Sequence, residues 1–95
     1  MILKIKDKLR ENVESIIHIL NELRCEHIKP LKNNEIRWGG NNGSKINIKT
    51  LAYVSYSHNH KGDVITMVSL LKNIKLGQAI KWLAEELNLS YEYNK

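Results

Sequence analysis

The stretch GDVITMVSLLKNIKLGQAIKWLAEELNL, residues 62–89, carries the strongest structural signals in the chain. The Asp63 carboxylate can cap the free N–H groups of a helix that follows it. Asn73 suits the end of this first helix, and Asn88 stands where a second helix would end in a left-handed residue. The stretch therefore predicts two helices. Their core-facing residues are Val64, Met67, Val68 and Leu71 in the first and Leu76, Ala79, Ile80, Leu83, Ala84 and Leu87 in the second.

The residues before this stretch have the pattern of a small antiparallel sheet. Residues 45–49 alternate polar and apolar side chains, and residues 51–56 are rich in β-branched and aromatic types. Asn33-Asn34 predicts a turn, and the glycine- and asparagine-rich residues 39–43 predict a loop that accepts positive φ angles. The predicted strands are residues 35–38, 45–49 and 51–56, and the polar residues 57–61 are expected to form a loop.

An amphipathic helix is predicted near the amino terminus, with Asn12 as its N-cap. A start at Asp7 is the alternative, and it would lengthen this helix backwards. Pro30 closes the segment because proline cannot continue a helix. The apolar stripe at helical spacing consists of Val13, Ile16, Ile17, Leu20 and Leu23.

The chain has 95 residues, of which 42% are hydrophobic, and this suits one domain spanning residues 1–95. No apolar run approaches the roughly 18 residues of a membrane span, and residues 1–10 lack a hydrophobic signal core. A single cysteine, Cys25, cannot form an internal disulfide. We therefore expect a cytoplasmic protein without a membrane partner.

The net charge of +5 is concentrated in the middle of the chain. Residues 28–62 hold six basic residues against Glu35 alone, whereas the rest of the chain holds nine basic and nine acidic residues. Such a basic segment favours a polyanionic partner such as nucleic acid, and the alternative is a solvated, lysine-rich surface. The six basic residues are Lys29, Lys32, Arg37, Lys45, Lys49 and Lys61.

Residues 62–65, 67–68 and 78–89 resemble the end of the zinc-binding domain of bacterial-type DNA primases. In that family a Gly-Asp or Gly-Asn pair opens a helix, as Gly62-Asp63 does here, and a helix of the type Glu-Ala-Val-Lys-Trp-Leu-Ala-Glu follows. Residues 12–17 resemble more loosely the family's opening helix. The resemblance implies an α+β fold, with a small antiparallel zinc-ribbon-like sheet flanked by an N-terminal helix and two C-terminal helices.

The chain departs from this family at the metal site. The family holds zinc with a Cys and a His on one hairpin and two Cys on the next, and the second pair falls near Ser55 and His58. The first pair falls in residues 36–40, which contain neither Cys nor His. A closed zinc site needs four nitrogen or sulfur ligands, so the resemblance implies a degenerate domain without metal or other cofactor.

A replacement metal site is an open alternative. It would use two pairs of Cys or His residues, each separated by one residue, which is a tighter spacing than zinc fingers usually have. The alternative is that the two histidines of the second pair lie in a solvated loop and that the cysteine is a small core residue. The four residues are Cys25, His27, His58 and His60. We further expect Trp38 to pack with Tyr53 or Tyr56 where the ion would have been.

No catalytic grouping is recognisable in the sequence, and we expect a protein that binds rather than an enzyme. In the primase family this domain contacts the single-stranded template, so the resemblance implies contact between nucleic acid and the polar face of the hairpins. Basic side chains would hold phosphates and aromatic rings would stack on bases, although each ring has a core position as its alternative. The candidate residues are Arg37, Trp38, Lys45, Lys49, Tyr53, Tyr56 and Lys61.

The expected setting is replication of a phage or mobile element, with single-stranded DNA or another nucleic acid as the partner. The alternative function is that of a small phage or mobile-element protein that binds and modulates a host helicase, primase or defence nuclease. This alternative function would be favoured by exposed apolar residues on the helices after Gly62, together with hairpins that carry no net charge. A homodimer is compatible with either function, since an exposed sheet edge can pair with itself.

Overall fold

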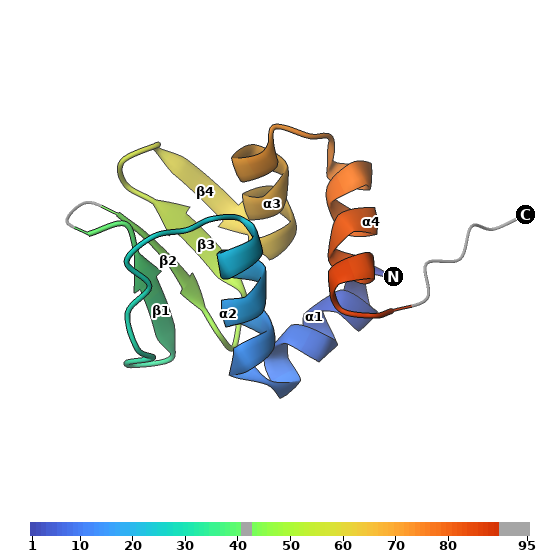
Figure 1. Ribbon diagram of the computed structural model, residues 1–95, viewed down its shortest axis with the longest axis horizontal. Helices are drawn as coiled ribbons and strands as arrows, with labels where there is room; N and C mark the ends of the chain where they lie inside the picture. The colour runs from blue at the N-terminus through green and yellow to red at the C-terminus, as the bar shows by residue number, and fades with distance from the viewer. Residues whose placement is uncertain (41–42, 90–95) are drawn as a thin grey trace, which may run out of the picture.

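The computed structural model describes residues 1–40 and 43–89 and combines helices with one antiparallel sheet (Figure 1). Asn41 and Asn42 of the predicted loop lie outside the described residues, as does the segment 90–95. The α+β class is as predicted, and so is the arrangement of an antiparallel sheet between N-terminal and C-terminal helical regions. The elements are α1 (Ile2–Glu11), α2 (Val13–Glu22), β1 (Glu35–Trp38), β2 (Ser44–Asn47), β3 (Ala52–Ser55), β4 (His60–Asp63), α3 (Val64–Lys72) and α4 (Leu76–Glu86).

The amino-terminal region forms two helices where one was predicted. The chain is extended at Asn12, with φ −147° and ψ 115°, so α1 ends there and α2 begins in a new direction. The Asn12 side chain accepts a hydrogen bond from the Glu14 N–H, which confirms Asn12 as the N-cap. The alternative start at Asp7 is wrong, because Asp7 lies inside α1 and not at the beginning of α2.

The sheet has the order β1-β2-β3-β4, and all neighbouring strands are antiparallel. The prediction of a loop over residues 57–61 is wrong at its end, because His60 and Lys61 belong to β4. There the backbone pairs with β3, with Tyr53 opposite Gly62, and this pairing outweighs the low strand propensity of polar residues. A side chain at Gly62 would meet Thr66 at 2.7 Å, so glycine permits the close turn into α3.

The two carboxy-terminal helices begin and end as predicted. The Asp63 carboxylate accepts hydrogen bonds from the N–H groups of Ile65 and Thr66, while Asn73 and Asn88 have left-handed φ angles of 54° and 58°. One core prediction is wrong: Leu76 is 56% exposed. It is the first residue of α4, one turn before the helix reaches the core at Ala79.

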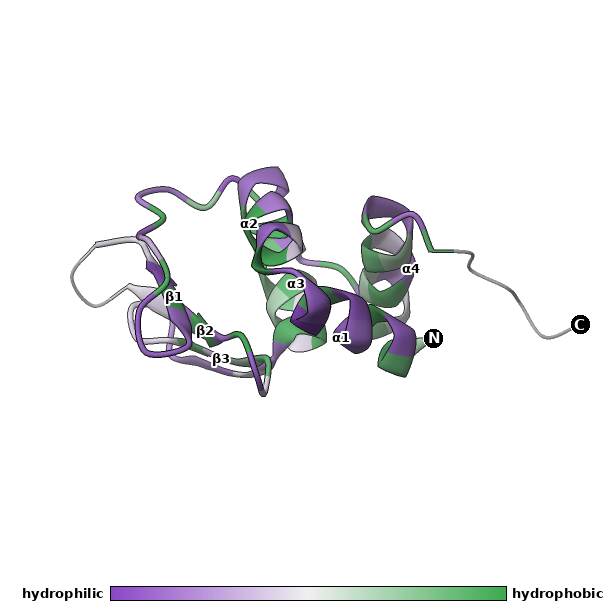
Figure 2. Cartoon of the chain, turned by 90° about the horizontal axis from the view of Figure 1, so that it is seen from below, coloured by the Kyte–Doolittle hydropathy of each residue, from purple (hydrophilic) through white to green (hydrophobic). Residues whose placement is uncertain are grey.

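The four helices lie on one side of the sheet and beyond its end. In Figure 2, α2 lies above the strands, and no helix among the described residues covers the lower face of the sheet. One continuous hydrophobic cluster joins both layers. Its sheet contribution is Ile36, Trp38, Ile46 and Tyr53, and its helical contribution includes Ile5, Leu9, Ile16, Ile19, Leu20, Val64, Met67, Val68, Leu83 and Ala84.

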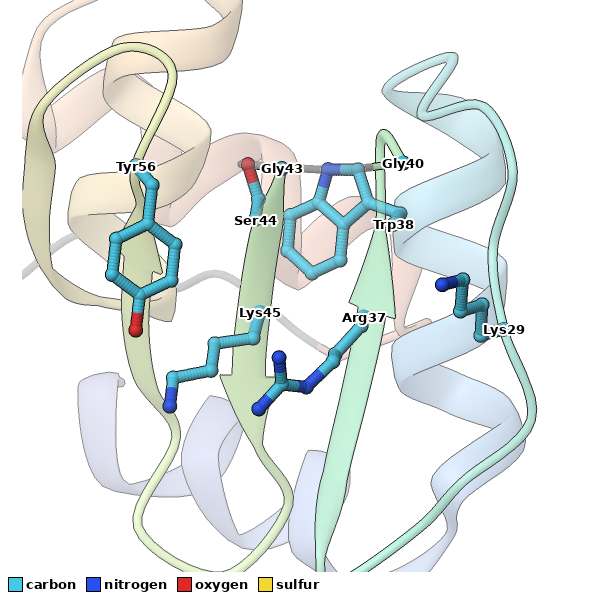
Figure 3. A pocket seen from close by; sticks show the side chains of 8 residues that line it. All are labelled: Lys29, Arg37, Trp38, Gly40, Gly43, Ser44, Lys45 and Tyr56. Carbon is cyan, nitrogen blue, oxygen red and sulfur yellow. The ribbon is translucent and has the colours of Figure 1, made fainter.

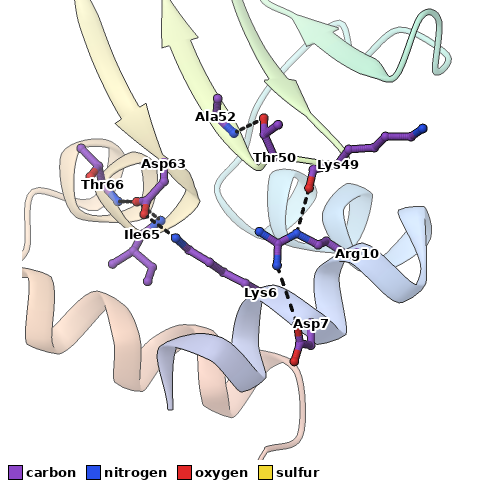
Figure 4. A network of polar contacts seen from close by, with 9 residues as sticks. All are labelled: Lys6, Asp7, Arg10, Lys49, Thr50, Ala52, Asp63, Ile65 and Thr66. Carbon is purple, nitrogen blue, oxygen red and sulfur yellow. Dashed lines mark hydrogen bonds and ion pairs between the residues drawn. The ribbon is translucent and has the colours of Figure 1, made fainter.

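Helix α1 is fixed to the strand ends by polar contacts (Figure 4). The Lys6 ammonium lies 3.0 Å from the Asp63 carboxylate at the start of α3. The Arg10 Nε donates to the Lys49 carbonyl, at 2.8 Å, in the turn between β2 and β3. These contacts hold α1 at the ends of the strands, which leaves the face of the sheet opposite the core uncovered.

Candidate nucleic-acid interface

The uncovered face of the sheet carries a row of basic side chains. In the strand register, Arg37 of β1 is opposite Lys45 of β2, and Val54 of β3 is opposite both Lys45 and Lys61 of β4. Successive side chains on a strand point to opposite faces, so these residues share the face opposite the buried Ile36 and Ile46. We call this surface the outward face.

Arg37 and Lys45 line an open hollow of about 350 Å³ on the outward face, together with Tyr56 and Lys29 (Figure 3). The figure shows the four side chains in one line across the sheet, in the order Tyr56, Lys45, Arg37 and Lys29. The other lining residues are Trp38, Gly40, Gly43 and Ser44. Four of the predicted site residues therefore line the hollow, namely Arg37, Trp38, Lys45 and Tyr56, and Lys29 joins them.

Lys29 was not among the predicted site residues, although it was counted in the basic middle of the chain. The Lys29 N–H donates to the Arg37 carbonyl at 2.8 Å, and the Gly39 N–H donates to the Glu26 carbonyl at 2.9 Å. These bonds lay the segment 26–29 along the edge of β1, and Pro30, which lacks an N–H, follows directly. The pairing continues beyond the proline, because Lys32 and Glu35 exchange two backbone hydrogen bonds of 3.0 Å.

Glu35 is the acidic residue beside this row. One of its carboxylate oxygens lies 3.2 Å from Arg37 and the other lies 3.1 Å from Lys45. The hydrogen bond from Lys45, followed by that from Arg37, holds the pKa of the Glu35 carboxyl below its ordinary value. The same bond to Glu35 raises the pKa of Lys45. Glu35 and Lys45 are therefore both charged at neutral pH.

The aromatic candidates divide between the two faces. Tyr56 is 58% exposed at the rim of the hollow, where its ring is open to a ligand. Tyr53 is fully buried and Trp38 is 5% exposed, because strand alternation turns them toward the core. Their rings stack at a centroid distance of 6.0 Å and an angle of 13°. Trp38 and Tyr53 therefore do not serve as stacking platforms for bases in this structure, and their prediction as such is corrected.

The remaining predicted residues, Lys49 and Lys61, do not line the hollow. Lys49 is exposed in the turn after β2, and its carbonyl is occupied by Arg10. Lys61 is exposed on β4, separated from Lys45 by Val54. Both extend the positive charge of the outward face beyond the hollow.

A chain of polar side chains occupies the region where the resemblance placed the second pair of zinc ligands. Ser55 is 1% exposed, accepts a hydrogen bond from the Ser44 hydroxyl at 2.9 Å and lies 3.3 Å from His58 Nδ1. The hydroxyl of Tyr53 lies 3.4 Å from His60 Nδ1. Hydrogen-bonded hydroxyls therefore surround the buried Tyr53, whose stacking on Trp38 confirms that these two rings pack together.

The four residues of the alternative metal site are not brought together as one ligand set. His58 and His60 lie side by side, with ring centroids 5.4 Å apart, whereas His27 is exposed with a left-handed φ of 58°. Burial raises the pKa of the Cys25 thiol to about 11, which disfavours the thiolate that a metal requires. Among residues 1–40 and 43–89, no group of three Cys, His, Asp or Glu residues is placed to hold a metal ion.

Three comparisons with known proteins complete the description of the site. No protein-family model, no curated protein and no solved structure matches the chain. Within the described residues, none of the helices combines the length and apolar character that crossing a membrane requires.

Proposed function

We propose that the protein binds single-stranded nucleic acid through the outward face of its sheet, without catalysing a reaction. The observation that carries this proposal is the hollow in which Lys29, Arg37 and Lys45 stand in line with the exposed ring of Tyr56. Cations bind the phosphates of any sequence, and an exposed ring stacks on an unpaired base. Because the faces of bases in a duplex are covered by their stacked neighbours, this combination favours a single strand over a duplex.

The resemblance of residues 62–89 to the primase zinc-binding domain supports the same function and suggests replication of a phage or mobile element as its setting. The matching part is the helical frame that supports the sheet. In the proposed complex the protein contacts nucleic acid through its sheet, as the primase family does, and uses basic and aromatic side chains for this contact. Zinc holds the hairpins together in that family, whereas packing and hydrogen bonds hold them here.

A second candidate function is binding to a host or phage protein such as a helicase, primase or nuclease. Leu70 and Leu76, on the helices after Gly62, are 40% and 56% exposed, which supports this candidate. The hairpins, however, are basic and not neutral, so we favour nucleic acid. A homodimer would have to use β4, because the segment 26–29 already covers part of the β1 edge.

The test is fluorescence anisotropy with a labelled single-stranded oligonucleotide at about 50 and about 200 mM salt. The protein and two variants, Lys45→Gln and Lys81→Gln, are compared. Both variants lose one positive charge, but Lys81 is exposed on α4, away from the sheet. We expect salt-sensitive binding that Lys45→Gln weakens several-fold and Lys81→Gln leaves nearly unchanged. No salt-sensitive binding at micromolar protein, or equal effects of the two variants, would refute the proposal.

Tyr56→Ala tests the aromatic part of the site. Stacking on one base is worth roughly 1–3 kcal/mol, so this variant should weaken binding to the single strand about tenfold. A duplex of the same sequence offers no unpaired base, and its weaker binding should change little. Equal losses for both ligands would show that Tyr56 does not stack.

A further inference from the structure

The cations of the hollow are already engaged by an anion of the protein itself. Glu35 spans Arg37 and Lys45, with one carboxylate oxygen 3.2 Å from the first and the other 3.1 Å from the second. Glu35 is on the same face of the sheet, on the same strand as Arg37. A phosphate that approaches Arg37 and Lys45 therefore either displaces the carboxylate or binds beside it against its negative charge.

Lys29 differs from these two cations. It lines the hollow on the far side of Arg37 and forms no ion pair among the described residues. Neighbouring strands in a sheet lie about 4.8 Å apart, so the line from Lys45 through Arg37 to Lys29 is about 10 Å long. The site thus offers three cations against one internal carboxylate, a net charge of +2, spread over a length that one phosphate group does not span.

We infer that Glu35 is a built-in competitor for phosphate, so that the hollow selects ligands with two or more linked phosphates over a single phosphate. The inference rests on the proposed function and assigns a selectivity device to the same site. A single phosphate only exchanges with the carboxylate, and a group tethered to the protein competes at an effective concentration in the millimolar range. Linked phosphates reach Lys29 as well, and this additional contact offsets the displacement of Glu35.

The line of Lys29, Arg37 and Lys45 also sets the direction in which a bound ligand would cross the sheet. A chain of phosphates that engages Lys29, Arg37 and Lys45 runs across the strands, and its end at Lys45 lies beside Tyr56 (Figure 3). The base attached at that end can reach the exposed ring. The ligand class is therefore a short, unpaired polynucleotide segment and not a free mononucleotide.

The experiment compares the unmodified protein with Glu35→Gln and with the control Glu85→Gln. Glutamine keeps the shape of the side chain and removes its charge, and Glu85 is exposed on α4, so both variants gain the same net charge. The probes are a short labelled oligothymidylate, sodium tripolyphosphate and inorganic phosphate. Melting temperatures check that the variants remain folded.

We expect Glu35→Gln to tighten oligothymidylate binding roughly eightfold at 50 mM salt and roughly threefold at 200 mM, because about 0.7 more counterions are released per added phosphate contact. Glu85→Gln should stay within about twofold. Tripolyphosphate should displace the oligonucleotide from the unmodified protein at a far lower concentration than inorganic phosphate does. In Glu35→Gln the ratio of these two concentrations should be smaller.

Two results separate this inference from the proposed function. If the protein binds oligothymidylate and Glu35→Gln leaves this binding unchanged or weakens it, the competitor role is overturned. The proposed single-strand binding then still stands. If tripolyphosphate binds and Glu35→Gln tightens it, but no oligonucleotide binds, the competitor role stands and the proposed function fails. If neither ligand binds to any of the three proteins, both are refuted.

Discussion

The two faces of the four-stranded sheet have opposite character. On β2, Ile46 is fully buried and packs in the core, while its neighbour Lys45 points the other way and lines the hollow. On β1, the buried Ile36 is followed by the exposed Arg37. Strand alternation thus assigns residues one position apart to separate tasks.

The two faces therefore separate the residues that stabilise the fold from those that we propose to bind nucleic acid. The inward face excludes water and contributes hydrophobic free energy, whereas the outward face holds charges that are screened by solvent. A change on one face should leave the property of the other face nearly intact. The predictions below test that separation, beginning with the largest expected effect.

The largest effect is expected from Ile46→Ala. Removing a fully buried side chain leaves a cavity, and such changes lower the free energy of unfolding by about 2–5 kcal/mol. Urea denaturation measures the loss. Lys45→Ala, one residue away on the other face, should cost less than about 1 kcal/mol, because it removes only a surface ion pair. Similar losses for the two variants would contradict the separation of the faces.

Gly62→Ala tests the close turn that joins the sheet to α3. The added methyl group would lie 2.7 Å from the Thr66 side chain, so a shift of the turn is required, and we expect a loss of about 1–3 kcal/mol. The control is Gly77→Ala in α4, where the methyl group meets no atom within 4 Å. Replacement of this helical glycine should raise stability by roughly 0.5–1 kcal/mol. Thermal unfolding followed by circular dichroism distinguishes the two signs.

Asp63 gives the stability a dependence on pH. Burial opposes its ionisation, but the hydrogen bond from the Thr66 N–H and the Lys6 ammonium outweigh burial, so the pKa of Asp63 is lowered. Because the folded pKa lies below the unfolded value of about 3.9, the stabilisation is present above that value and is lost as the pH falls through the folded pKa.

Asp63→Ala should therefore cost about 1 kcal/mol at pH 7, through loss of the helix cap. The cost should shrink as the pH is lowered below about 4. Asp63→Asn keeps a capping oxygen and does not titrate, so it isolates the effect of charge. Denaturation curves from pH 3 to pH 7 would contradict this account if the difference between the protein and Asp63→Asn grew toward low pH.

Local sequence rules predict the starts of α2 and α3 and the ends of α3 and α4, and they fail where contacts distant in sequence decide the structure. Asn12, Asp63, Asn73 and Asn88 act within one turn of their own position, so the sequence identifies them directly. Strand β4 contains polar residues and a glycine, and it becomes a strand only because β3 is beside it. The separate helix α1 was missed, since its contribution to the core is the single pair Ile5 and Leu9.

The candidate site was predicted in part for the same reason. Arg37, Lys45 and Tyr56 were chosen from residue type and are brought together by the hollow. Arg37 and Trp38 are neighbours on one strand, so strand alternation alone places their side chains on opposite faces. Lys29 depends on a backbone bond to Arg37 that no local pattern encodes.

The smallest effect is expected from Lys61→Gln, which asks how far the binding surface extends across the outward face. Lys61 shares the row with Lys45, but Val54 lies between them and Lys61 does not line the hollow. An exposed charge outside the contact region acts only through a screened field, with a Debye length of about 10 Å at 0.1 M salt. Its loss should therefore weaken oligonucleotide binding less than about twofold and change stability by no more than about 0.5 kcal/mol.

The decisive comparison is the salt dependence of binding for Lys61→Gln and Lys45→Gln. Removing a residue that contacts a phosphate makes the negative slope of log K against log salt less steep by about 0.7. Removing a residue outside the contact region changes the slope by much less. Equal slopes for the two variants would extend the bound strand across Val54 to β4. A smaller change for Lys61→Gln would confine the bound strand to β1, β2 and the Lys29 segment.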